Sequence, residues 1–457
     1  MISNYKIIIS LFFLIFFSYF SKAEDWFFYD RLAVGSQPVA VILNTSSEFS
    51  QCYILCYGID KNYNDIFEEG DEYPSLWRLN VRFMTGYLSF EDFTIHTEKI
   101  RDFPFGSIGI PFRPAVAGDT LYMCQNGIVS SYYLPTGNVI EDTIIRAKAS
   151  AISKIGNKLF LSIRESLDTN YVLVYDIDNK SVRDSIPAYT MVQQTLSIGE
   201  NLLAILCEGN WGSNDSKLII ANVEGKHEVL KTLMLGSGGN HVAFHNDLLA
   251  VTTGDNLVLV YSIHQDSINL VKTINLPTSG FDGVRESTFD GDSLIYTSSW
   301  DSHIYISDLN GSMPKFIDAK GKAEGFAIAE FFNTYKVLVI TNQFITNSYQ
   351  PDNNITIYSN FPISSVNNKK KENNFRLYPN PIQEIAYLEF NSNINEDFNQ
   401  AEIYSLIGEY LGSAEVSNLY NTNILQLNLS KLNLQRGIYN LKLIGFNGTK
   451  GILFVKE

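Results

Sequence analysis

The sequence predicts an all-β protein in which a seven-bladed β-propeller is followed by a small Ig-like β-sandwich. Aromatic residues make up 13% of the 457 residues, which favours strands over helices. A short apolar strand also recurs between residues 113 and 359, starting at Leu121, Leu159, Leu203, Leu249, Leu294 and Val337. The steps between these starts are 38, 44, 46, 45 and 43 residues, which is the period of a propeller blade.

Each repeat is predicted to hold four short strands separated by turn residues. In the best-defined repeat the predicted strands are 241–245, 248–253, 257–262 and 270–274. Asn246-Asp247 and Gly254-Asp255 supply the turns between the first three strands. Four strands per unit at this period are typical of a propeller blade. Six such units and an irregular first unit in residues 24–112 make seven.

The last repeat ends at residues 355–358 and leaves little room for a fourth strand of its own. The segment Trp26-Phe27-Phe28-Tyr29 has the composition of a strand and lies at the other end of the repeating region. We therefore predict that this N-terminal segment completes the last blade and closes the ring. The propeller resembles the bacterial seven-bladed propellers described as YVTN or quinoprotein-like, in its period and strand texture only.

The chain is expected to divide into four parts. Residues 1–23 resemble a secretory signal peptide, because Lys6 precedes an apolar run from Ile7 to Phe20 that is too short to span a membrane. Residues 24–360 form the propeller, and residues 361–374 are a polar linker that includes Lys369-Lys370-Lys371. Residues 375–457 alternate apolar and polar positions between frequent turns, as an antiparallel sandwich does. No other stretch is long and apolar enough to cross a bilayer.

The last domain carries a specific combination of motifs: Tyr378-Pro379-Asn380-Pro381, Gly408 after the strand of Ile403-Tyr404, Leu429-Ser430-Lys431-Leu432, Gly437-Ile438-Tyr439 and the near-terminal Lys456. With these it closely resembles the C-terminal sorting domain of type IX secretion cargo in Bacteroidetes-like bacteria. The resemblance implies Sec-dependent export to the periplasm, passage across the outer membrane by the type IX machinery, and release or anchoring at the cell surface. The alternative is an Ig-like domain that binds a ligand itself.

Composition limits the partners. The formal net charge of −15 argues against nucleic acid or an anionic membrane surface as the main partner. Cys56, Cys124 and Cys207 occupy equivalent places at the ends of apolar strands, where other repeats have Ser162 or Thr252. A small residue is needed there, so buried free thiols are favoured over a disulfide framework.

A candidate calcium loop runs from Asp60 to Glu72. Asp60, Asn62, Asn64 and Asp71 supply oxygen atoms at loop positions 1, 3, 5 and 12, and the carbonyl of Ile66 lies at position 7. This pattern resembles a dockerin or EF-hand loop without its helices, although position 6 is Asp65 rather than glycine. The ion would have a structural role, ordering a loop that is otherwise too acidic. The alternative is a solvated acidic turn.

A second candidate site is the propeller face formed by the loops between second and third strands and by the connections between blades. Near the tunnel this face is expected to collect Arg113, Gln193, Gln194, Asn240, His241, Asp282, Arg285, Glu286 and Glu324. Around them we expect the loop residues Arg164, Glu165, Trp211, Trp300 and Phe344. Polar groups beside aromatic rings suit a sugar or another small polar ligand. The alternative is the polar, water-filled tunnel that propellers commonly have.

Catalytic signals are weak. Gly-x-Ser-x-Gly, phosphate-loop and His-Glu-x-x-His motifs are absent from the sequence, and His241 and His245 have no third ligand at metal spacing. A carboxylate pair such as Asp282 and Glu286 could serve a glycosidase or lyase, but most such pairs are solvated loop charges. We therefore predict a non-enzymatic binding or surface-structural module, without an organic cofactor and with a glycan or envelope component as partner. The alternative is an extracellular hydrolase or lyase of polysaccharide acting on the same face.

Overall fold

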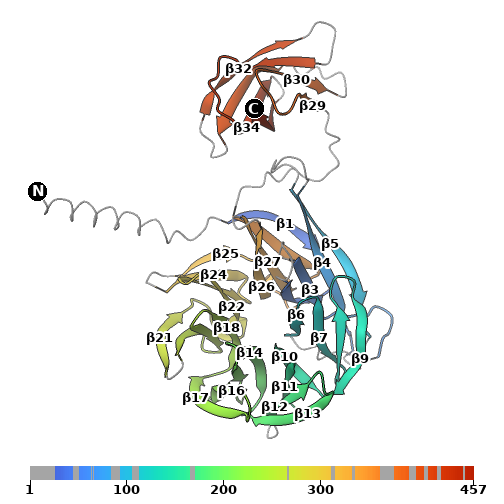
Figure 1. Cartoon of the computed structure of the whole chain (residues 1–457), viewed down its shortest axis with the longest axis vertical. Helices are drawn as coiled ribbons and strands as arrows, with labels where there is room; N and C mark the ends of the chain where they lie inside the picture. Colours follow the sequence, from blue (N-terminus) through green and yellow to red (C-terminus); the bar gives the residue numbers. More distant parts are fainter. Residues whose placement is uncertain are drawn as a thin grey trace, which may run out of the picture. The chain divides into compact units, whose positions relative to one another are not determined.

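The computed structural model describes residues 26–44, 51–62, 64, 66–83, 93–104, 113–164, 170–210, 212–264, 267–309, 314–331, 335–360, 375–390, 398–405, 410–418, 424–445 and 448–456. The predicted signal peptide (1–23) and linker (361–374) lie outside these residues, as do Asp65, Glu165, Trp211 and Gly408. Within them the chain forms seven four-stranded antiparallel sheets around a common centre, and a separate seven-stranded sheet (Figure 1). The prediction of an all-β, seven-bladed propeller is confirmed.

The blades are built from β1 to β28. The first strand of each blade is β2 (Pro38–Asn44), β6 (Ala115–Ala117), β10 (Ala149–Ile155), β14 (Val192–Ser197), β18 (Gly239–His245), β22 (Val284–Asp290) or β26 (Lys322–Phe331). The second strands are β3 (Gln51–Cys56), β7 (Thr120–Gln125), β11 (Lys158–Arg164), β15 (Leu202–Cys207), β19 (Leu248–Thr253), β23 (Leu294–Ser299) and β27 (Tyr335–Phe344). Blades are numbered 1 to 7 in this order.

The third strands are β4 (Ser75–Phe83), β8 (Ile128–Tyr133), β12 (Asn170–Asp176), β16 (Ser216–Asn222), β20 (Leu257–His264), β24 (His303–Asp308) and β28 (Asn354–Ser359). The outer strands are β5 (Phe93–Asp102), β9 (Asn138–Arg146), β13 (Ser181–Pro187), β17 (Glu228–Gly236), β21 (Ser267–Asn275), β25 (Lys315–Asp318) and β1 (Phe27–Ala33). Second strands such as β15 and β19 are almost wholly buried because neighbouring blades cover both of their faces.

The core is a ring of clusters between blades rather than one central mass. One cluster joins Leu206 of blade 4 to Val251 of blade 5, and another joins Val260 of blade 5 to Ile295 of blade 6. Small residues end the second strands, as predicted: Cys56, Ser162, Cys207 and Thr252 are fully buried. All four cysteines are free and buried, which confirms the prediction of free thiols.

The ring closes as the sequence predicts. β1 pairs with β28 in antiparallel register from Phe27 opposite Ser359 to Ala33 opposite Asn354. Trp26 Nε1 donates to the Tyr296 hydroxyl at 3.0 Å, and an ion pair joins Arg31 Nη2 to Asp352 Oδ2 at 2.5 Å. The N-terminal strand is thus the fourth strand of blade 7, and the first and last segments of the propeller share one sheet.

Six first strands have an irregularity in pairing near their beginning. In β22, for example, Val284 faces Ser299 and Ser287 faces Thr297, so Arg285 and Glu286 stand opposite a single residue. Equivalent shifts occur at the start of β2, β10, β14, β18 and β26. A bulge of this kind redirects side chains out of the normal alternation, and here it affects the positions nearest the tunnel.

The C-terminal domain is a two-layered β-structure. Its sheet order is β29 (Phe375–Tyr378), β30 (Ile385–Phe390), β33 (Ile424–Asn428), β32 (Tyr410–Asn418), β31 (Phe398–Ser405), β34 (Gly437–Gly445) and β35 (Gly448–Lys456). The first half of β32 pairs with β31 and its second half pairs with β33, so this strand passes from one layer to the other. Leu388 and Leu425 of one layer share a core with Ile403, Leu443 and Phe454 of the other, as expected for a sandwich.

Candidate functional site

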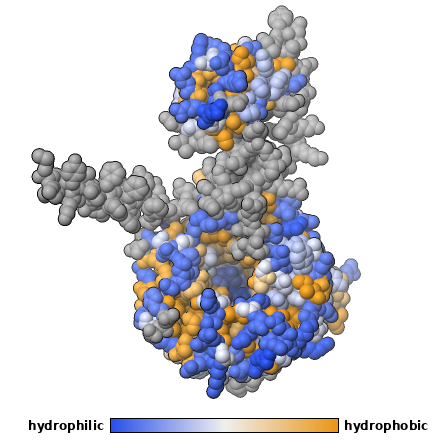
Figure 2. Space-filling model, in the orientation of Figure 1, coloured by the Kyte–Doolittle hydropathy of each residue, from blue (hydrophilic) through white to orange (hydrophobic). Residues whose placement is uncertain are grey.

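Residues predicted to face the tunnel do come together there. Arg113, which precedes β6 of blade 2, forms an ion pair from Nη2 to Oε1 of Glu286 in blade 6 at 2.9 Å. Both side chains are only 14% exposed. The pair therefore spans non-adjacent blades at the centre of the ring, where Figure 2 shows a hollow with hydrophilic surface.

Burial controls the protonation of the acids near the tunnel. Burial raises the pKa of Glu286 to about 7, and the Arg113 guanidinium opposes this rise. Burial also raises the pKa of Glu324 against the opposing effect of Arg285 and Arg113. The pKa of Tyr57 is raised well above its usual value by burial and then by Glu324. Glu286, Glu324 and Tyr57 thus belong to one buried cluster in which desolvation favours the protonated form of each group.

His241 is a structural residue of the same region. Its Nδ1 accepts a hydrogen bond from the backbone N–H of Ser287 at 3.1 Å, so the ring proton is on Nε2. Burial, followed by the charge of Arg113, lowers the pKa of His241 well below its usual value. Neutral His241 thus joins blades 5 and 6. Over the described ranges of the chain, no three His, Cys, Asp or Glu side chains group together to hold a metal ion.

Gln194 likewise links neighbouring blades. Its amide oxygen accepts from the Val242 N–H at 2.8 Å, and its amide nitrogen donates to the Val242 carbonyl at 3.2 Å. The side chain is buried, with both polar ends used. Gln194 was predicted as part of a ligand face, and the structure gives it a joining role between blades 4 and 5.

Arg285 and Trp300 form a stacked pair beside the tunnel. The guanidinium carbon of Arg285 lies 3.6 Å from the centre of the Trp300 ring. Trp300 Nε1 donates to Oε2 of Glu324 at 2.6 Å, and Arg285 Nη2 donates to the Phe281 carbonyl at 3.1 Å. The sequence placed Trp300 among loop aromatics that would contact a ligand, but Trp300 is only 9% exposed and its ring contacts Arg285 instead.

The exposed aromatic surface comes from two residues that the sequence analysis missed. Phe281 and Tyr349 are 55% and 52% exposed, and their ring centres are 5.9 Å apart. Tyr349 donates its hydroxyl proton to Asp282 Oδ1 at 2.7 Å, and Lys322 Nζ reaches the same oxygen at 2.5 Å. Asp282, predicted as a ligand-face residue, therefore fixes this aromatic surface in place. The name aromatic shelf is used below for Phe281 and Tyr349.

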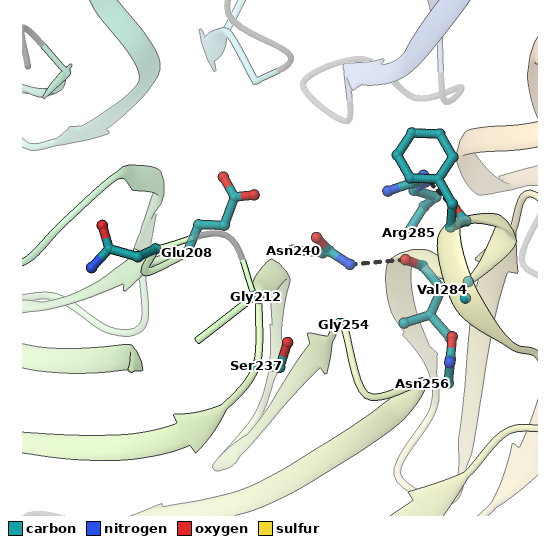
Figure 3. Close-up of a pocket in the computed structure, with 13 residues that line it drawn as sticks. Glu208, Gly212, Ser237, Asn240, Gly254, Asn256, Val284 and Arg285 are labelled. Atoms are coloured by element: carbon teal, nitrogen blue, oxygen red, sulfur yellow. Dashed lines mark hydrogen bonds between the residues drawn. The ribbon is translucent and has the colours of Figure 1, made fainter. Parts of the chain in front are cut away.

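A pocket of about 210 Å³ opens on this face between blades 4, 5 and 6 (Figure 3). Three connections line it: the β15–β16 loop, the β17–β18 connection and the β19–β20 loop. The short 3₁₀ helix before β22 and the starts of β18 and β22 complete the wall. The lining residues are Glu208, Asn210, Gly212, Ser237, Gly238, Asn240, Gly254, Asn256, Gly280, Phe281, Gly283, Val284 and Arg285. Five glycines bring the backbone close to the space. Asn240 Nδ2 donates to the Val284 carbonyl at 2.9 Å, which fixes the amide at the pocket floor.

Glycine is required at one edge of this pocket by close packing. A Cβ atom on Gly283 would lie 2.2 Å from Oδ1 of Asn256. Asn256 Oδ1 in turn accepts from the Thr278 hydroxyl at 2.7 Å, so it cannot move without losing that bond. The pocket wall is therefore formed before any ligand arrives. The pocket opens on the face that the sequence analysis singled out, and whether that face binds a ligand stays a prediction. The sequence gives no signal for the pocket itself, because glycine and asparagine in loops are also ordinary turn residues.

The predicted calcium loop is folded by its own side chains. Asp71 accepts hydrogen bonds from the N–H groups of Lys61 at 3.0 Å and Glu68 at 2.8 Å. Asn62 and Asn64 both donate side-chain hydrogen bonds to the Glu68 carboxylate, at 2.6 and 3.2 Å. Asp60 is buried, and the Ile66 side chain is 61% exposed. The predicted oxygen donors thus belong to one compact turn, and calcium binding there stays a prediction.

The sorting motifs meet on the last strand of the C-terminal domain. Asn380 Oδ1 accepts from the N–H of Val455 at 2.9 Å, and the N–H of Ile382 donates to the Val455 carbonyl at 2.7 Å. Lys456 lies opposite Gly437 in the β34–β35 register. The motif that opens the domain and the one that ends it are therefore neighbours in space.

Further motif residues complete this end of the domain. The Tyr439 hydroxyl donates to the Gln435 carbonyl at 2.7 Å, and its ring centre lies 5.7 Å from that of Phe454. Tyr378 pairs with Tyr387 in the β29–β30 ladder, and the bonds that precede Pro379 and Pro381 are cis. No helix in the described part of the chain is long and apolar enough to cross a membrane.

Comparison with known proteins identifies one part of the chain. Residues 376–454 match the family model of the secretion system C-terminal sorting domain. No curated protein matches the chain. Among solved structures it is similar to the WD40 β-propeller domain of Doa1, with 12% identity, a TM-score of 0.49, and coverage of 73% of this chain and 96% of that one. The quinoprotein-like subtype stays a prediction. Residues 376–454 are a secretion system C-terminal sorting domain of the type IX kind, which directs the preceding seven-bladed propeller to the cell surface or the extracellular space.

Proposed function

We propose that this protein is a non-enzymatic binding module that works at the cell surface or in the extracellular space and holds one sugar unit of a glycan in the pocket between blades 4, 5 and 6. The observation that carries the proposal is the pocket itself: a preformed space lined by backbone and by three asparagine amides, next to the exposed ring of Phe281. Amides and carboxylates fix sugar hydroxyls, while an aromatic face packs on the apolar side of a sugar ring.

Rigidity supports binding over a purely structural role. The aromatic shelf is tied to the propeller through Asp282 and Lys322, and Arg285 is stacked on Trp300. A site that is ordered before binding avoids the entropy cost of ordering it on association.

The acids near the tunnel favour binding over catalysis. Glu286 is paired with Arg113, and Asp282 is paired with Lys322 and Tyr349. A glycosidase needs two carboxylates that are available to one glycosidic bond. Asp282 and Glu286, the carboxylate pair that the sequence offered, are each ion-paired with a cation of the protein instead. A hydrolase or lyase on the same face is the second candidate.

The test is a glycan-binding screen of the full chain, followed by affinity measurements on Phe281→Ala and Glu208→Gln. We expect each variant to weaken binding about tenfold or more. The matched controls are Phe316→Ala and Glu228→Gln, which change exposed residues of the same types on outer strands of blades 6 and 4. Unchanged affinity in both pocket variants would refute the site, and release of shorter products from a bound glycan would establish the enzyme instead.

A structural calcium ion in the Asp60–Glu72 loop is proposed as a separate property. The support is the spacing of oxygen donors at Asp60, Asn62, Asn64, Ile66 and Asp71. The loop connects β3 to β4 in blade 1, away from the residues that line the pocket. An ion there would stabilise blade 1 rather than contact the ligand.

A further inference from the structure

We propose that the ligand unit in this pocket is an acidic sugar, and that Arg285 recognises its carboxylate. This inference rests on the proposed function and adds the chemical class of the ligand. Among the described residues that line the pocket, Arg285 carries the only positive charge. A planar guanidinium matches a carboxylate with two parallel hydrogen bonds, which an ammonium group does not.

Arg285 is held in one orientation but is incompletely paired. Its guanidinium carbon lies 3.6 Å from the centre of the Trp300 ring, and Nη2 donates to the Phe281 carbonyl. Its nearest carboxylate, Glu324, is 3.7 Å from Nε, which is too long for a good hydrogen bond. The short bond to that Glu324 oxygen comes from Trp300 Nε1 at 2.6 Å. Glu324 is therefore shared between two donors.

One donor of Arg285 has no acceptor. Its Nε is buried and makes no hydrogen bond to any described residue. Buried charged groups are normally paired and hydrogen-bonded, since a missing partner costs free energy. Arg113 Nε also lacks an acceptor, but Arg113 and Lys322 each have a carboxylate oxygen within 2.9 Å, whereas the Glu324 oxygen is 3.7 Å from Arg285. Arg285 is thus the cation of this face that gains most from an anionic partner brought by a ligand.

The rest of the pocket selects a sugar acid over other anions. Figure 3 shows Glu208 and Arg285 projecting from opposite walls, with Asn240 between them. Glu208 accepts hydrogen bonds from hydroxyl groups and repels a second carboxylate, so the ligand's acid group is directed to the Arg285 side. Phe281, 55% exposed, offers its ring face beside Arg285. A hydroxylated ring with one carboxylate satisfies all three groups.

The size of the pocket sets how much of the ligand enters. Its volume of about 210 Å³ is smaller than the ~300–1,000 Å³ sites that enclose drug-sized molecules. A single sugar ring fits, while neighbouring units of a polymer must lie outside. The aromatic shelf extends from the pocket edge at Phe281 to Tyr349 in blade 7 and provides a surface for the adjoining unit.

The experiment compares oligogalacturonate, its methyl ester and a neutral oligosaccharide of equal length by calorimetry with the full chain. We expect the acid to bind at least about tenfold more tightly than its ester, because esterification removes the charge that Arg285 pairs. Raising the salt concentration should weaken binding of the acid and leave the neutral sugar unaffected. The ester comparison leaves the protein unchanged, so it does not depend on any variant folding.

The protein-side test is Arg285→Lys, which keeps the charge and removes the bidentate geometry. We expect the preference for acid over ester to fall about tenfold, while Arg183→Lys on the outer strand β13 keeps it. Equal affinity for acid and ester overturns the inference and leaves the proposed function standing if neutral glycans bind. Binding of free amino acids but of no sugar acid overturns it as well, and absence of binding to every glycan overturns both proposals.

Discussion

Glu286 shows how a single buried acid connects the propeller to pH. Its carboxylate lies at the tunnel with Arg113 as its ion-pair partner, and Glu324, Tyr57 and His241 belong to the same cluster. Burial raises the pKa of Glu286 from 4.5 to about 7. The folded state therefore holds this proton more tightly than the unfolded state, so stability from this group is greatest below pH 4.5 and is lost as pH rises to about 7.

We predict that Glu286→Gln flattens the dependence of thermal stability on pH between about 5 and 7. The expected difference in unfolding free energy between the two proteins over that window is about 3 kcal/mol, because the pKa of Glu286 rises from 4.5 to about 7 on folding. Melting temperatures of wild type and variant across this range measure it. His241 acts with the opposite sign, because its lowered pKa destabilises the fold only as pH falls below 6.5. Identical slopes in the two proteins would contradict the assignment of Glu286.

The buried cysteines give a second prediction for single residues. Burial raises the pKa of Cys52 to about 12 and that of Cys207 to about 11. A thiol reacts as its thiolate, so both burial and pKa protect these groups. A chromogenic disulfide reagent at pH 8 should label none of the four cysteines in the native protein and all four in denaturant. Fewer than four after unfolding would reveal a disulfide.

At the scale of elements, the stability of the closed ring depends most clearly on the N-terminal strand β1. β1 exposes most of its side chains, so its contribution comes from backbone pairing with β28 and from contacts such as Trp26 with Tyr296. We predict that deleting residues 24–32 lowers the melting temperature by on the order of 5 °C or more. A synthetic peptide with the deleted sequence, added in excess, should restore part of this loss. An unchanged melting temperature would show that the ring is stable while open.

The loop between β3 and β4 provides a metal-dependent prediction. If calcium binds there, adding it should stabilise the folded protein by a free energy of RT ln(1 + [L]/Kd) and so raise its melting temperature. EDTA should reverse the effect. Asp71→Asn should abolish the response, although it also weakens the two backbone hydrogen bonds that Asp71 accepts. Magnesium at equal concentration is the control ion. Equal melting temperatures with calcium and with EDTA would show that the loop is an acidic turn held by its own hydrogen bonds and not a calcium site.

The elements could be predicted from the sequence further than the site could. The repeated apolar strands gave the blades, and the short last repeat gave the closing strand, because both depend on period and length. The bulges at the starts of the first strands were not visible, since one extra residue hardly changes an apolar pattern. These bulges include Arg285, Asn240 and Glu324 and set the direction of their side chains.

The sequence predicts that Trp300 is exposed, whereas it is buried. Its burial depends on tertiary contacts such as that with Arg285, which no local pattern encodes.

At the scale of the whole molecule, two units divide the work. The propeller carries the pocket, and the sorting domain carries the motifs that meet on β35. We predict that deleting residues 376–457 abolishes delivery to the cell surface or medium while the propeller stays folded. Fractionation with an antibody against the propeller measures this, and a reporter placed between residues 1–23 and residues 361–457 should be exported. Export of the tail-less chain at the wild-type level would contradict the prediction.

The pairing of Phe27 with Ser359 has a consequence for how the chain is made. The ring cannot close until a ribosome has passed the end of blade 7, so β1 must wait for a partner more than 300 residues away. The segment that follows directly encodes the export address. A chain that ends before β28 therefore lacks both the strand that closes the ring and the sorting domain. The order of elements along the sequence thus links closure of the propeller to possession of the sorting domain.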